Sequence, residues 1–69
     1  MLVMSNLKDE LHTLIGYWIQ HNQEHGQEFL EWAEKAKPLG NEVTQPLSEA
    51  ADKMAKVNNW LEKARQALG

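Results

Sequence analysis

The sequence contains no cysteine, few basic residues and no long apolar run. Without cysteine the chain forms no disulfide and offers no thiolate ligand, so any metal site must use imidazole and carboxylate groups. Seven Lys and Arg residues face ten Asp and Glu residues, which gives a net charge of −3. This balance argues against a nucleic-acid partner, because clustered cations are what bind a phosphate backbone.

The hydropathy pattern shows neither a secretory signal nor a membrane span. The first ten residues lack a basic region followed by an apolar core, and no later stretch approaches the roughly 20 apolar residues that cross a bilayer. Attachment to a membrane surface is also disfavoured, because the polar faces of the expected helices are acidic rather than basic. We therefore expect a cytoplasmic location and no membrane partner.

A chain of 69 residues is long enough for one small domain, which we place at residues 1–69. A domain of this size buries a modest fraction of its surface, so a second subunit or a metal often stabilises it. The chain nevertheless has three tryptophans, and large aromatic side chains supply much of the buried area in cores and interfaces. We expect four aromatic residues to anchor the core or an interface: Trp18, Phe29, Trp32 and Trp60.

The strongest break in the sequence is K-P-L-G-N at residues 37–41. Before it, apolar residues fall on one face when successive residues are stepped by about 100° around a helix. After it, apolar residues alternate steps of four and three, which is the heptad pattern of a bundle helix. The sequence therefore predicts two long helices, over about residues 6–37 and 43–68.

Two long helices with a short connection form an antiparallel hairpin, so we predict an all-α fold of this kind. A lone hairpin leaves each helix half covered, and Trp60 lies off the apolar seam of its own helix. We therefore expect a homodimer in which two hairpins form a four-helix bundle. The alternative is a three-helix bundle with a break near residues 21–22, where polar residues interrupt the apolar pattern.

The interruption in the first helix consists of polar residues at helical spacing. Asn22 and His25 fall inside the apolar face, and His21 lies on its flank. Reflection of the chain through the turn places His21 opposite Asn58, a polar residue beside the seam of the second helix. Buried polar groups persist when they are hydrogen-bonded, and a polar layer can set helix register and oligomeric state. We therefore expect a buried or semi-buried layer made of His21, Asn22, His25 and Asn58.

The two histidines also suit a metal ion. Residues four apart share one face of a helix, and a histidine pair with this spacing binds zinc in metalloprotease helices. Glu28 lies one turn beyond His25 and would add an oxygen ligand, while a dimer would add a second histidine pair. Nitrogen and oxygen ligands without sulfur fit Zn, Ni or Co. Transition-metal binding or sensing through His21, His25 and Glu28 is therefore the alternative function.

No catalytic site is predicted. A His–Glu pair can act as acid and base, but no candidate nucleophile lies near it and the second helix has no histidine. The Glu-x-x-His order of di-iron bundles is also absent. Because no set of catalytic groups converges, we expect a non-enzymatic interaction or oligomerisation module that binds a second copy or another protein.

Residues 18–33, W-I-Q-H-N-Q-E-H-G-Q-E-F-L-E-W-A, resemble a run found in small uncharacterised prokaryotic helical proteins. That run reads roughly W-I-x-H-N-x-x-H-x-x-x-F-x-x-W-A, and it covers about a quarter of the chain. The resemblance implies a helical hairpin in which the His-Asn-His trio has a purpose, and it implies no established activity. The matching residues in this sequence are Trp18, His21, Asn22, His25, Phe29, Trp32 and Ala33.

Overall fold

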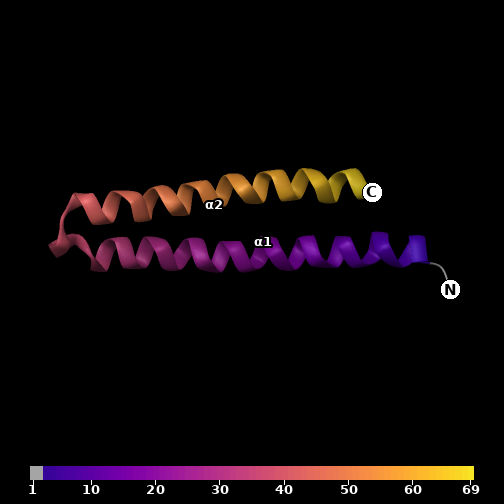
Figure 1. Ribbon diagram of the computed structural model, residues 1–69, viewed down its shortest axis with the longest axis horizontal. Helices are drawn as coiled ribbons and strands as arrows, with labels where there is room; N and C mark the ends of the chain where they lie inside the picture. Colours follow the sequence, from indigo (N-terminus) through magenta and orange to yellow (C-terminus); the bar gives the residue numbers. More distant parts are fainter. Residues whose placement is uncertain (1–2) are drawn as a thin grey trace.

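The computed structural model describes the backbone of residues 3–69 and the side chains from residue 7 onward. Helix α1 spans Val3–Lys35, helix α2 spans Asn41–Leu68, and the short 3₁₀ helix η1 (Lys37–Leu39) joins them. The two long helices run antiparallel and lie side by side along their length, as Figure 1 shows. The predicted all-α hairpin is confirmed.

Helix α1 continues without a break through residues 21–22, so the alternative three-helix bundle is wrong. No proline interrupts this region, and the Asn22 side chain bonds to α2 instead of competing for the backbone of its own helix. The helix begins at Val3, three residues before the predicted start at Asn6. It ends two residues early, at Lys35, because Pro38 has no N–H with which to continue the hydrogen-bond ladder.

The turn between the helices depends on Gly40. Its N–H donates to the carbonyl of Lys37 at 3.0 Å, and this bond closes η1. Its backbone has φ 104° and ψ 163°, a conformation that is essentially restricted to glycine. The carbonyl oxygen of Gly40 accepts the N–H groups of Val43 and Thr44, at 3.1 and 3.2 Å. Helix α2 therefore begins at Asn41, two residues before the predicted start.

The hairpin is a single layer of helices with little core. Its principal extents are 57 × 17 × 12 Å, as expected for two long helices packed side by side. Among the residues whose side chains are described, Ile15 and Ala33 are the buried apolar ones, at 2% and 7% exposure. Neither helix, over its described length, is long and apolar enough to cross a bilayer.

Candidate functional site

The two histidines of α1 meet at their ring edges. One helical turn separates His21 from His25, so their side chains lie next to each other on the same surface of the helix. Their Nε2 atoms are 3.1 Å apart. The ring centroids are 4.6 Å apart and the ring planes are nearly perpendicular, at 83°. The structure thus brings together two of the predicted site residues, with one nitrogen of each ring directed at the other.

Glu28 holds the second ring nitrogen of His25. Its Oε1 lies 3.0 Å from Nδ1 of His25. An ionised carboxylate only accepts hydrogen bonds, so we assign the proton of the neutral His25 ring to Nδ1. The lone pair of His25 is then at Nε2 and faces His21. The Nε2–H of His21 completes the contact by donating to it.

Aromatic rings extend the histidine pair in both directions along α1. Tyr17 stacks on His21 with a centroid separation of 5.2 Å and an interplanar angle of 21°. Phe29 stacks on His25 at 6.3 Å and 23°. The four rings follow a spacing of four residues, so they form one continuous row on the helix surface. The contacts with Tyr17 and Phe29 restrict the orientation of both imidazoles.

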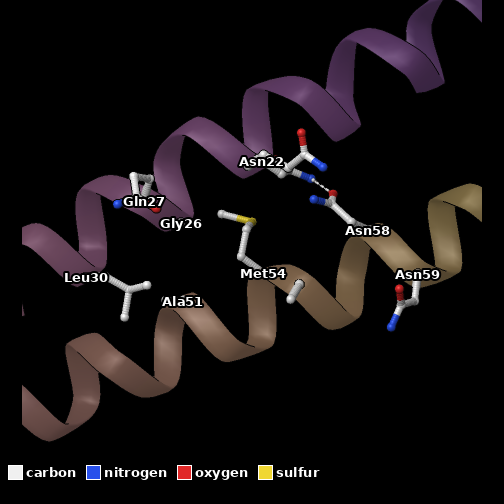
Figure 2. Close-up of a pocket in the computed structure, with 10 residues that line it drawn as sticks. Asn22, Gly26, Gln27, Leu30, Ala51, Met54, Asn58 and Asn59 are labelled. Atoms are coloured by element: carbon white, nitrogen blue, oxygen red, sulfur yellow. Dashed lines mark hydrogen bonds between the residues drawn. The ribbon is translucent and has the colours of Figure 1, made fainter.

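A separate polar contact joins the two helices at Asn22 and Asn58. The Asn22 side-chain amide donates to Oδ1 of Asn58 at 3.0 Å, as Figure 2 shows. The amide of Asn58 donates to the backbone carbonyl of Ile19 at 3.3 Å. Both asparagines are partly buried. The contact therefore links α1 and α2 through two hydrogen bonds in a region shielded from much of the solvent.

The predicted four-residue layer is divided in the structure. Asn58 faces Asn22 instead of His21, so the helix register differs by one residue from the reflection through the turn. Asn22 and His21 point about 100° apart around α1, so the helix that presents Asn22 to α2 leaves His21 at the side of the seam. His21 is exposed, and the His25 side chain retains 45% of its exposure. The asparagines thus form the link between the helices, and the histidines lie beside it on the surface.

Gly26 lies where α1 and α2 come close together, and sequence reasoning did not place it at this contact. A Cβ built at Gly26 would lie 3.8 Å from Cβ of Met54. Figure 2 shows the Met54 side chain between the two helices at this level. A groove beside this contact is lined by Leu30 and Ala55 among others. A glycine in the interior of a predicted helix was the signal that could have indicated this close approach.

None of the four predicted aromatic anchors is buried within the hairpin. Trp18 is 39% exposed, Trp32 58% and Trp60 69%, and Phe29 is partly buried. The seam between two helices is a narrow strip, and residues about 60–100° from its centre remain at its side. Lysine side chains cover part of two indoles: Lys35 lies 4.6 Å from the Trp32 ring and Lys63 lies 4.2 Å from the Trp60 ring. The anchors therefore contribute to the surface of this chain.

The predicted metal ligands do not form a three-residue cluster. Over the part of the chain that the structure describes, no group of three or more His, Asp or Glu side chains is arranged to hold a metal ion. Glu28 contacts the far nitrogen of His25, so its carboxylate does not converge with the two Nε2 atoms. What the arrangement offers is one pair of imidazole nitrogens, with a carboxylate behind one of them.

Comparisons with known proteins found a relative and a family model that each match most of the chain. It is 34% identical over 61 residues to an uncharacterized protein of Archaeoglobus fulgidus, and the match covers 88% of this chain and 98% of that protein. No solved structure matches. Residues 11–68, which include the histidine pair and both asparagines, match the domain of unknown function DUF8180. The chain therefore belongs to the DUF8180 family.

Proposed function

We propose that this protein is a non-enzymatic helical interaction module in which two hairpins associate into a four-helix bundle. The observation that carries this proposal is a set of large apolar side chains that the hairpin leaves exposed. Such side chains are normal when scattered singly, but a contiguous apolar patch is typical of an interaction site. The members of this set are Leu7, Leu14, Trp18, Trp32, Val43, Val57 and Trp60.

In α1 these residues lie on one side of the seam. Leu14 and Trp32 each immediately precede a buried seam residue, Ile15 and Ala33, so both are turned from it by about 100° in the same sense. Trp18 lies three residues after Ile15, which turns it by about 60° in that sense as well. The exposed apolar residues of α1 therefore share one broad face of the hairpin.

The exposed apolar residues of α2 extend the same face. Val57 immediately precedes the seam residue Asn58, so it is displaced in the same sense along its own chain. The opposite sides of the two helices meet in the groove lined by Leu30 and Ala55. The other sides of the two helices, which carry Leu14, Trp32 and Val57, therefore also lie next to each other and form one surface. Trp60 extends this surface around α2. We call this surface, made of the seven exposed residues named above, the apolar face.

The extent of the exposed surface matches what a dimer needs. The solvent-accessible surface of the chain is 5502 Å², whereas a compact monomer of 7.9 kDa is expected to expose about 4,400 Å². The excess, about 1,100 Å², compares with the roughly 800 Å² that each partner buries in a stable interface. A second hairpin laid on the apolar face would also supply the second layer that a helical domain needs. We therefore infer that a second copy of this chain covers the apolar face.

Light scattering after gel filtration tests this proposal over a range of protein concentrations. The expected mass is that of two chains. Trp32→Ser removes an exposed aromatic from the apolar face, and Leu30→Ser is the matched control because Leu30 is also exposed but lies on the opposite face.

A hot-spot residue contributes at least about 2 kcal/mol, and a two-fold dimer contains it twice, so Trp32→Ser should weaken the dimer about a thousandfold. Leu30→Ser should leave the mass of the native protein unchanged. A native chain that stays monomeric and helical at every concentration would contradict self-association. The apolar face would then be assigned to a different protein partner.

A further inference from the structure

We propose that His21 and His25 form a two-imidazole site for a divalent transition metal, and that Glu28 acts as its positioning carboxylate. All three residues lie on α1, so one chain supplies the whole site, which lies on the same side of the seam as the apolar face. The absence of sulfur ligands and the presence of two imidazoles favour borderline ions such as Zn²⁺, Ni²⁺ or Co²⁺. The structure thereby changes the expected role of Glu28 from a ligand to a residue that acts through His25.

The distance between the two imidazole nitrogens is suited to a shared ion. Histidine nitrogens bind zinc at about 2.0–2.1 Å. Two such ligands are about 2.9 Å apart at an angle of about 90° and about 3.4 Å apart at the tetrahedral angle. The Nε2 atoms of His21 and His25 are 3.1 Å apart, which lies inside this range. An ion can therefore bind both nitrogens at their present separation, and each ring turns so that its lone pair points at the ion instead of at the other ring.

The tautomer of His25 is already the one that a metal requires. Its Nδ1 is held by Oε1 of Glu28 at 3.0 Å, so the lone pair of the neutral ring is at Nε2. This is the carboxylate–histidine arrangement that orients ligating histidines and raises their basicity. In the metal-free protein, His21 donates its Nε2–H to His25. When a metal binds, the proton of His21 leaves Nε2 and the neutral ring keeps its proton at Nδ1 instead.

The surroundings of the pair favour a cation and leave it accessible. A shallow surface region of the same helix is lined by Glu24, Glu28 and Glu31 among others, and their carboxylates give this part of α1 a negative potential. Tyr17 and Phe29 stack against the two imidazoles and limit their rotation. In the single hairpin His21 is exposed, so water or another small ligand can occupy the remaining coordination positions there.

Isothermal titration of Zn²⁺ into the untagged, metal-free full chain tests the site. We expect saturable binding of one ion per chain, and a loss of affinity of at least about tenfold in His21→Gln and in His25→Gln. His12→Gln is the matched control, because His12 is an exposed histidine on the same helix and outside the pair. This control should bind Zn²⁺ as the native chain does. Far-ultraviolet circular dichroism of each variant should show unchanged helix content.

Glu28→Ala tests the positioning role separately. Loss of a residue that orients a metal-ligating histidine typically lowers metal affinity about 10–100-fold, and we expect a loss in that range. Nitrogen-15 spectra of the imidazoles provide the second readout. In the native metal-free chain His25 should carry its proton on Nδ1, this preference should disappear in Glu28→Ala, and Zn²⁺ should move the proton of His21 from Nε2 to Nδ1.

The proposal is overturned if the native chain shows no saturable binding, or if binding persists in both histidine variants. Unchanged affinity in Glu28→Ala would overturn the role of the carboxylate. Light scattering of the same samples, with and without Zn²⁺, reports self-association separately. A monomeric protein that binds Zn²⁺ would support the metal site and contradict the proposed dimer. A dimeric protein that does not bind Zn²⁺ would support the dimer and contradict the metal site.

Discussion

The contact between Asn22 and Asn58 allows a quantitative test of how the helices are held in register. Asn58 takes part in two partly buried hydrogen bonds, at 3.0 Å with Asn22 and at 3.3 Å with the Ile19 carbonyl. Each bond contributes about 0.5–1.5 kcal/mol net. We therefore expect Asn58→Ala to lower the free energy of unfolding by about 1–3 kcal/mol and Asn22→Ala to lower it by about 0.5–1.5 kcal/mol.

The double variant separates the bond between the asparagines from other effects. Because both single substitutions remove the same hydrogen bond, the double variant loses it only once, and the coupling energy should be about 0.5–1.5 kcal/mol. Asn59→Ala is the matched control, since it makes the same gain in helix propensity at an exposed position. We expect this control to lower the free energy of unfolding by less than about 0.5 kcal/mol, or to raise it.

Thermal unfolding followed by circular dichroism measures these differences. A loss of about 1 kcal/mol should lower Tm by about 4–8 °C in a domain of this size. All variants must be compared at one protein concentration, because self-association would make Tm depend on concentration. If the two single effects add with no coupling, the asparagines do not bond in solution and the explanation of the helix register is wrong.

Three glycines provide further predictions, two of them stabilising and one destabilising. Gly26→Ala should raise the free energy of unfolding by about 0.5–1 kcal/mol, because alanine is the better helix former and the added Cβ would meet Met54 at an ordinary 3.8 Å. Chemical denaturation measures this gain in stability. A loss of stability would mean that the helices cannot accept a methyl group there. Gly16→Ala should gain less, since its Cβ would lie 3.3 Å from the Arg65 guanidinium. Gly40→Ala should lower Tm through a backbone strain of about 1–3 kcal/mol, because φ is 104° with open space around the site; an unchanged Tm would show that the turn does not need this conformation.

The helices themselves were predictable because their signals are local. Apolar spacing at the helical period survives across residues 21–22, and the Pro38–Gly40 break has a direct backbone cause. The turn also constrains the pairing, so simple reflection places residues within one position of their observed partners. The predicted bounds of the helices were less accurate, since the first and last turns depend on which carbonyl each backbone N–H donates to.

The placement of individual side chains needed the tertiary structure. Adjacent residues point about 100° apart around a helix, so the rotation of α1 decides whether residue 21 or residue 22 faces Asn58. The same sensitivity explains the role of Glu28. Sequence spacing showed that Glu28 is close to His25, but only the side-chain geometry shows that its carboxylate contacts Nδ1, away from the histidine pair.

The sequence alone determined that this protein is a hairpin of two amphipathic helices, because helical period, proline and glycine act over a few neighbouring residues. The tertiary structure decided which polar groups join the helices and which remain outside. Asn22 lies in the seam and bonds to Asn58, while His21 and His25 lie beside it with their Nε2 atoms 3.1 Å apart. That difference arises from the rotation and register of two packed helices, which are set by the contacts between them, including the close approach of Met54 to Gly26.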